Sequence, residues 1–329
     1  MGQWYGDELV PMAGIASVGI APEYRGTGAA IALLSHTLKE LHANGVPLSV
    51  LYAATQRPYR KVGYEQSGVF CSRELPTNSI QIADRTLPMQ PVIPVSHEVF
   101  HELYHQKARV NNGHLARNQT LWEEMLEPPK EQMIYAYLIG SETQPEGYVI
   151  FFQYRESDES IMIIRDWVVL TAAAGRRFWT FIADHRSIID KVQWRSSMAD
   201  PLTLLLPEET DDIYESGHWM LRVVDVPKAL EKRGYPEGVE ARLHLDVRDD
   251  LLLENNGQFV LTVSEGQAQV TRGGKGELKL DVRSLAPLYT GLFTPHQLQL
   301  TGQIEASDTA LSVATQLFSG SQPWMCDKF

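Results

Sequence analysis

The sequence predicts a mixed α/β fold whose pattern changes near residue 227. Before that point, short apolar runs alternate with amphipathic stretches of helical length, as in α/β domains. After it, four strand-like stretches follow one another and are separated by turn-forming Asp and Gly residues. A chain of 329 residues is long enough for several domains. We therefore expect domains at residues 1–92, 93–226 and 227–329.

Composition limits the partners and the compartment. The chain has 29 Lys and Arg residues and 41 Asp and Glu residues, and its net charge is therefore −12. This charge disfavours nucleic acid as a partner and favours cationic partners. No apolar run reaches the ~18 residues of a membrane span, and the N-terminus lacks a signal-peptide pattern. Cys71 and Cys326 form no CxxC motif, which indicates a reducing, cytoplasmic compartment and no zinc site. His97, His101 and His105 recur every four residues, and we interpret them as polar helix surface rather than a metal site.

A glycine-rich turn is expected between the first buried strand and the first helix. Residues 15–20 are small and apolar, and Pro22 is expected to end their strand because proline cannot donate to a ladder. Gly26 and Gly28 allow unusual φ values and close approach of a ligand. A helix start offers unpaired N–H groups and the positive end of its dipole, so a diphosphate fits there. A glycine-rich turn without a ligand is the alternative. The N–H groups expected at this site are those of Thr27, Gly28, Ala29 and Ala30.

The helix after this turn and the strand beyond it are clear in the sequence. Ile31, Leu34, Leu38 and Leu41 share one helical face, and Gly45 stands where a glycine ends a helix. The next strand is expected at residues 47–54 and is apolar enough to be buried.

The order strand, Pro22, Arg25, Gly28 and Ala30 resembles the acetyl-CoA loop of the GCN5-related N-acetyltransferases (GNAT). In that family, the strand before the loop holds the pantetheine arm by backbone hydrogen bonds. The resemblance implies acetyl-CoA as cosubstrate and tandem GNAT folds. The cofactor-binding residues that it implies are Val18, Gly19, Ile20, Arg25, Gly26, Thr27, Gly28, Ala29, Ala30 and Ala54.

The resemblance sharpens at residues 55–65, where a short helix is expected before Val62-Gly63-Tyr64. This pattern is similar to the Eis (enhanced intracellular survival) branch of the family. In that branch a tyrosine donates a proton to the departing CoA thiolate, and the resemblance assigns this role to Tyr59. The alternative for Tyr59 is a packing tyrosine with a hydrogen-bonded hydroxyl. We expect Tyr64 to lie in the core.

The later parts of the chain are similar to the same branch. Residues 95–225 repeat the α/β plan, and the turn at 170–177 lacks the cofactor-loop order, so we interpret a second, degenerate GNAT domain that serves as scaffold. Residues 227–329 resemble a sterol-carrier-like α+β domain, either a lipid holder or a structural cap. Residues 1–12 resemble the tail of a strand or a hairpin, and a complete GNAT domain has more strands, so we expect the first domain to be incomplete at its N-terminus. Strands are expected at 132–139, 147–154, 161–170 and 191–195, and a helix at 175–185.

The end of the chain is predicted to dock. Trp324, Met325 and Phe329 make it more apolar than a frayed tail. In the Eis branch the α-carboxylate of the last residue takes a proton from the substrate amine, and the resemblance assigns this role to Phe329. A desolvated carboxylate has a raised pKa and is a better base. A docked tail without chemistry is the alternative.

Three functions remain open from sequence. The first is an acetyl-CoA-dependent N-acetyltransferase that acts on a primary amine of an aminoglycoside, polyamine or lysine side chain, by direct attack on the thioester. The second is a non-catalytic CoA- or lipid-binding protein, and the third is a CoA-binding regulator without turnover. The resemblance also implies a homo-oligomer, a hexamer in that branch. We expect neither a nucleic acid nor a membrane partner.

Overall fold

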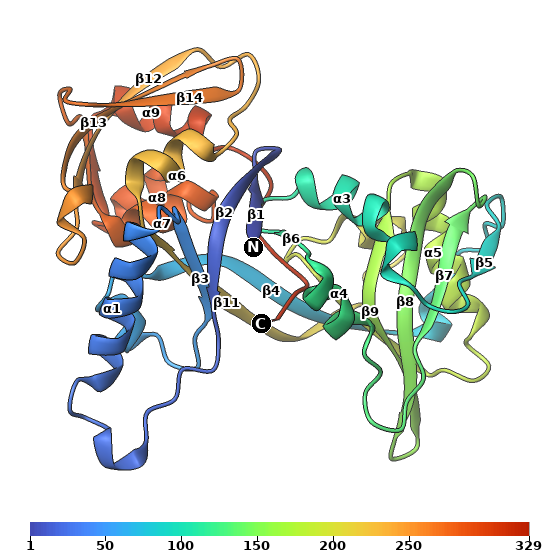
Figure 1. The fold of residues 1–329 in the computed structure, drawn as a ribbon. Helices are drawn as coiled ribbons and strands as arrows, with labels where there is room; N and C mark the ends of the chain where they lie inside the picture. The colour runs from blue at the N-terminus through green and yellow to red at the C-terminus, as the bar shows by residue number, and fades with distance from the viewer. Residues whose placement is uncertain (329) are drawn as a thin grey trace. The chain divides into compact units, whose positions relative to one another are not determined.

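The computed structural model describes residues 1–328, which form two compact units (Figure 1). Unit 1 contains Met1–Val69, Arg109–Ala116 and the residues from His218 onward. Unit 2 contains Phe70–Ala108 and Arg117–Gly217. The division into three domains predicted from sequence stays a prediction.

The first sheet of unit 1 carries the predicted glycine-rich turn. Its strands follow the order β4–β11–β3–β2–β1–β6, of which β4 and β11 continue into unit 2. Strands β1 and β2 form an antiparallel hairpin, one of the two alternatives predicted for residues 1–12, whereas β2 and β3 are parallel and are joined through α1. The ends of β2 and β3 therefore lie at the same edge of the sheet. The bounds are β1 (Gly2–Tyr5), β2 (Glu8–Ile15), α1 (Ala29–Ala43), β3 (Leu48–Tyr52), α2 (Arg57–Arg60), β4 (Glu65–Pro76), β6 (Leu115–Ala116) and β11 (Asp212–Val223).

Helix α1 buries the face predicted from its spacing. Leu34 and Leu38 are buried, and Ile31 and Leu41 pack half-buried against the same hydrophobic cluster. Gly45 has a φ of 72°, which is the left-handed conformation of a helix-ending glycine. The cluster also contains Leu51, Val62, Tyr64, Met220, Val224 and Leu252.

The second sheet of unit 1 has five strands in the order β14–β13–β12–β15–β16. The four strands predicted after residue 227 are confirmed, and β16 and α8 were not predicted. Helix α7 is almost wholly buried between its neighbours. The bounds are α6 (Val226–Lys232), β12 (Ala241–Arg248), β13 (Gly257–Ser264), β14 (Gln267–Arg272), β15 (Leu278–Asp281), α7 (Val282–Thr290), α8 (Pro295–Leu300), β16 (Ile304–Ala306) and α9 (Asp308–Leu317).

Unit 2 repeats the α/β plan, as the sequence predicted. Its strands follow the order β5–β7–β8–β9–β10–β4. Within it, the Asp166 carboxylate is buried, pairs with Arg117 and accepts a hydrogen bond from the Tyr148 hydroxyl at 2.7 Å. The bounds are β5 (Met89–Pro91), α3 (His101–Arg109), α4 (Gln119–Leu126), β7 (Tyr135–Gly140), β8 (Pro145–Glu156), β9 (Glu159–Val169), α5 (Ala172–Asp184) and β10 (Lys191–Ser196).

Residues 1–328 lack two kinds of structural feature. None of their helices combines the length and the apolar character that crossing a bilayer requires. The same residues contain no group of three or more His, Cys, Asp or Glu side chains arranged to hold a metal ion.

Candidate functional site

The segment between β2 and α1 differs from the predicted strand. The sequence predicted a strand through residue 20, but β2 ends at Ile15. Its pairing with β3 stops where Ile15 lies opposite Leu51, and Ser17 then has a φ of 55°. This left-handed conformation turns the chain out of the ladder, a step that apolar composition does not reveal. Residues 18–20, predicted to bind the cofactor from a strand, therefore lie outside the sheet.

The glycine-rich part of this segment is open to solvent. Figure 1 shows the chain leaving the end of β2, running clear of the sheet and returning to the start of α1. Gly26 and Gly28 have φ values of 80° and 90°, which favour glycine. A Cβ atom built on either residue meets no atom within 4 Å, so their backbones face open space. The surrounding space would admit a side chain at both positions. Glycine is favoured there because of the positive φ values of the backbone.

The N-terminus of α1 has no side-chain cap. The helix begins at Ala29, and its N-cap is Gly28, which has no side chain to accept from the first N–H groups. Thr27 was predicted within the first turn, but it precedes the helix, and its hydroxyl donates to the Tyr24 carbonyl at 2.7 Å. Arg25 is exposed, and its Nε–H donates to the carbonyl oxygen of Ile20 at 3.4 Å. The first turn of this 15-residue helix thus offers free N–H groups and positive dipole to an anion.

Tyr59 lies at the same edge of the sheet. It belongs to α2, which follows the end of β3 after Ala53 and the exposed Ala54. Its ring packs half-buried against the hydrophobic cluster of α1, which Val18 also contacts. Burial raises the pKa of the Tyr59 hydroxyl above its ordinary value, so the hydroxyl keeps its proton at neutral pH. Val18 and Tyr59 are 41 positions apart in the sequence, and both pack against the same hydrophobic cluster.

Tyr64 is a core residue, as predicted. It is fully buried, and its hydroxyl lies 2.7 Å from the Ser49 hydroxyl on β3. Its ring stands edge-on to the Tyr59 ring, with the two centroids 6.0 Å apart. Burial raises the pKa of Tyr64 as well.

The end of the described chain docks on unit 1, which confirms the docking prediction. Trp324 to Asp327 are all buried. The Trp324 N–H donates to the Asn112 carbonyl at 3.1 Å, and its ring stands edge-on to His114 at 4.5 Å. The Val69 N–H donates to the carbonyl of Pro323 at 3.0 Å.

The docked tail reaches the end of β3. The Tyr52 hydroxyl donates to the Asp327 carbonyl at 2.8 Å, a contact between residues 275 positions apart. Tyr52 is the last residue of β3, so the tail arrives at the edge where Ala54 and α2 begin. Sequence reasoning missed Tyr52, because no motif marks it. Phe329, the predicted base, lies outside the described residues.

Family models match three parts of the chain. One acetyltransferase (GNAT) domain matches residues 4–67, and a second acetyltransferase (GNAT) domain matches residues 113–223. A sterol carrier protein domain matches residues 226–326. Two GNAT domains followed by a sterol-carrier-like domain are the fold that the sequence predicted.

Relatives agree with the family models. The crystal structure of a GCN5-related N-acetyltransferase from Anabaena variabilis has a TM-score of 0.98 and 57% identity, covering 100% of this chain and 85% of that one. The N-acetyltransferase Eis of Mycobacterium tuberculosis is 25% identical over 324 residues, covering 93% of this chain and 77% of the relative. Eis1 from Mycobacterium abscessus shares the fold, with a TM-score of 0.83 at 24% identity, covering 100% of this chain and 85% of that one. The chain is similar to Eis over almost its whole length, and it is an N-acetyltransferase that belongs to the GCN5-related N-acetyltransferases.

Proposed function

We propose that this N-acetyltransferase takes its acetyl group from acetyl-CoA and transfers it to a primary amine. The main observation in support is that the N-terminus of α1 has no side-chain cap. It is preceded by Gly26 and Gly28, which have left-handed φ values and are open to solvent. The diphosphate of CoA is an anion of the kind that such a helix start binds. When bound, acetyl-CoA supplies the acetyl group as a reactive thioester.

The residues around the turn are assigned binding roles. The N–H groups of Gly28, Ala29 and Ala30 bind the diphosphate, and Gly26, Thr27 and Arg25 shape the loop around it. Residues 18–20 and Ala54 line the pantetheine arm. In support, Val18 and Gly19 make no backbone hydrogen bond to another described residue, so their polar groups remain available. The Val18 N–H is then a donor for the thioester carbonyl oxygen, where negative charge develops.

The proton transfers are assigned to Tyr59 and to the end of the chain. Tyr59 donates its hydroxyl proton to the departing thiolate sulfur, and its raised pKa keeps that proton in place beforehand. The α-carboxylate of Phe329 takes a proton from the substrate amine. The hydrogen bond between Tyr52 and Asp327 supports this assignment, because it holds residues close to the chain end at the edge of β3. A carboxylate at this place favours a cationic substrate, because it attracts the ammonium group and then accepts its proton.

The experiment is an assay of free thiol released from acetyl-CoA in the presence of single amines. The panel contains an aminoglycoside, a polyamine and a lysine-containing peptide, with a secondary alcohol as the non-amine control. We expect amine-dependent thiol release and an acetylated product of matching mass. Binding of CoA by calorimetry without thiol release for any amine would contradict the proposed reaction. The absence of CoA binding to the folded protein would contradict the proposed cofactor site.

We also propose that the protein is cytoplasmic and that it forms a homo-oligomer, whose size can be measured. Its measurement is the mass of the native protein by light scattering.

A further inference from the structure

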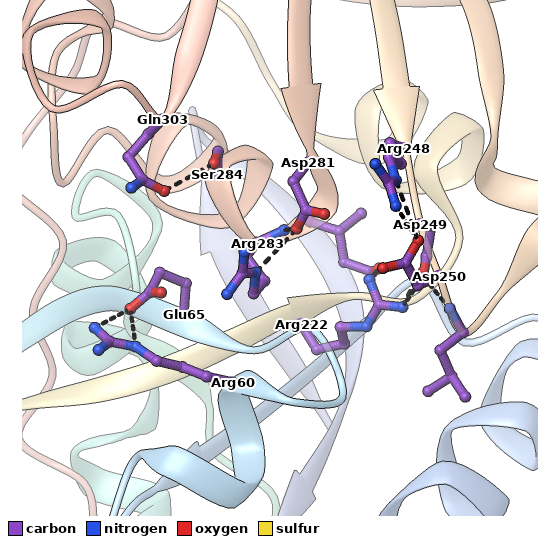
Figure 2. A network of polar contacts seen from close by, with 12 residues as sticks. Arg60, Glu65, Arg222, Arg248, Asp249, Asp250, Asp281, Arg283, Ser284 and Gln303 are labelled. Atoms are coloured by element: carbon purple, nitrogen blue, oxygen red, sulfur yellow. Dashed lines mark hydrogen bonds and ion pairs between the residues drawn. The ribbon is translucent and has the colours of Figure 1, made fainter.

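A buried ion pair lies beneath the turn that follows the helix of Tyr59. Arg222 on β11 and Asp249 after β12 have side chains that are 0% and 1% exposed. Arg222 Nη2 donates to both carboxylate oxygens of Asp249, at 2.8 and 2.7 Å (Figure 2). The proposed reaction uses neither residue. Burying two charges away from water is costly, so the residues that contact this pair indicate what the pair holds in position.

The guanidinium of Arg222 is in contact with Gly63. A Cβ atom on Gly63 would lie 2.7 Å from both Cζ and Nε of Arg222, so no side chain fits between them. Gly63 has a φ of 92°, which lets the chain turn at this point. The N–H groups on either side of it, those of Val62 and Tyr64, both donate to the carbonyl of Tyr59, at 3.0 and 3.2 Å. The position of the guanidinium therefore limits the turn that ends α2.

A second route runs from Arg222 to the Tyr59 ring. Arg222 lies directly opposite Ser49 across the β11–β3 pairing. The Ser49 hydroxyl is hydrogen-bonded to the Tyr64 hydroxyl at 2.7 Å, and the Tyr64 ring stands edge-on to the Tyr59 ring. The backbone of Tyr59 is thus linked to Arg222 through the Gly63 turn, and its ring is linked to Arg222 through Tyr64 and Ser49.

Asp249 is fixed by the sterol-carrier-like domain. Its Oδ1 accepts from the N–H groups of Leu251 and Leu252, at 3.0 and 3.1 Å. Its Oδ2 accepts from Asn255 Nδ2 at 2.9 Å. All of these donors lie within residues 226–326, the part that matches the sterol carrier protein model. The counterion of Arg222 is therefore a rigid feature of that domain.

We propose that Asp249 and Arg222 are positioning residues for Tyr59, so that the sterol-carrier-like domain takes part in acetyl transfer by fixing the turn after α2. This inference rests on the proposed role of Tyr59 as proton donor. The domain acts through the Gly63 turn and binds neither substrate for this purpose. The Asp249 carboxylate holds the Arg222 guanidinium against Gly63. Loss of that carboxylate leaves the guanidinium buried without its counterion, so the guanidinium shifts and the turn at Gly63 shifts with it.

The test compares Asp249→Asn with Asp250→Asn. The two aspartates are adjacent and each pairs with an arginine (Figure 2). The side chains of the Arg248–Asp250 pair are 75% and 77% exposed, so this pair contributes little to stability. For Asp249→Asn we expect kcat to fall about 10- to 100-fold, the range of a small misplacement of a reacting group. The Kd of acetyl-CoA is expected to stay unchanged, because its loop does not contact Asp249. Asp250→Asn is expected to keep the kcat of the wild type.

A second variant covers failure of Asp249→Asn to fold. Gly63→Ala keeps both charges of the ion pair but places a methyl group where it overlaps the Arg222 guanidinium, so either the turn or the guanidinium must shift, and we expect the same fall in kcat at unchanged Kd. In a Tyr59→Phe background, Asp249→Asn is expected to cost no further kcat, since both changes act on one step. Unchanged kcat in Asp249→Asn and Gly63→Ala, or an equal loss with and without Tyr59, overturns the inference.

Failure of the proposed function has a different signature. If Tyr59→Phe alone keeps full kcat, Tyr59 is not the proton donor, and the coupling is read from hydrogen exchange instead. Asp249→Asn should then speed exchange in the peptide that carries the Val62 and Tyr64 amides, and Asp250→Asn should not. Unchanged exchange in Asp249→Asn overturns the positional coupling itself.

Discussion

At the scale of single residues, Tyr59 combines two properties that a proton donor needs. Its ring is packed against the α1 cluster and against Tyr64, so its orientation is restricted. Its hydroxyl has a pKa raised by burial and is therefore protonated when the reaction begins. A tyrosine in the core, such as Tyr64, shares the second property but has its hydroxyl committed to Ser49.

Tyr59→Phe is expected to lower kcat about 10²-fold or more, because general acid catalysis contributes that much. The Kd of acetyl-CoA should be unchanged, since the ring and its packing remain. The measurement is steady-state thiol release together with calorimetric titration. Tyr135→Phe, on β7 and 39% exposed, is the matched control and should behave as the wild type. Full kcat in Tyr59→Phe would remove this residue from the mechanism.

The pH dependence follows from the direction of the Tyr59 shift. A general acid works only while protonated, and the pKa of Tyr59 is raised from 10.0. Its contribution is therefore fully present at neutral pH and is lost only as the pH rises through a value above 10.0. We expect kcat to show no falling limb from neutral to mildly alkaline pH. A fall in that range that disappears in Tyr59→Phe would mean a lowered pKa, opposite to our expectation.

At the scale of elements, the segment between β2 and α1 shows where local sequence signals stop. The helix, its buried face and its terminating glycine follow from spacing and were predicted correctly. The end of β2 was predicted five residues too late, at residue 20 instead of Ile15. Residues 16–20 are as apolar as a strand, but Ser17 has a φ of 55° and β3 ends only one residue after the last paired position, Leu51.

Gly28→Ala tests the loop as an anion-binding element. The residue has a φ of 90°, and alanine in the left-handed region costs about 1–2 kcal/mol. We expect the loop to leave this conformation and the Kd of acetyl-CoA to rise about tenfold. Gly302→Ala is the control, because Gly302 has a φ of 69° and equally open surroundings but lies outside the loop. Equal Kd values for both variants would contradict a diphosphate site at Gly28.

At the scale of the molecule, unit 1 is assembled from three stretches of the chain. Residues 109–116 contribute β6 and the carbonyl of Asn112 that receives the Trp324 N–H. The tail then runs on to Tyr52 at the end of β3. The end of the chain thus contacts both residues 109–116, at Asn112, and the first stretch, at Tyr52.

Trp324→Ala tests the tail. Trp324 is 5% exposed, and truncation of a buried Trp costs about 3–5 kcal/mol, enough to release a short tail. We expect kcat to fall about 10²-fold with an unchanged Kd of acetyl-CoA, because the proposed base is lost while the loop remains. Trp324→Phe keeps a ring on His114 and should retain most of the activity. Limited proteolysis confirms release, and full kcat with a released tail would exclude a catalytic tail.

The sequence by itself determined what depends on neighbouring residues. Periodicity located α1, strands β7 to β10 and strands β12 to β15, and the spacing of Pro22, Arg25 and Gly28 indicated the family. These features are local, because a helix face or a turn is set by residues a few positions apart.

The tertiary structure alone decided which distant residues meet. Arg222, Gly63 and Asp249 carry no shared motif, yet they form one buried contact set. Asp327 and Tyr52 are 275 positions apart and are joined by one hydrogen bond. Such contacts depend on how sheets and domains pack, and on which buried polar groups must find partners, so no short stretch of sequence encodes them.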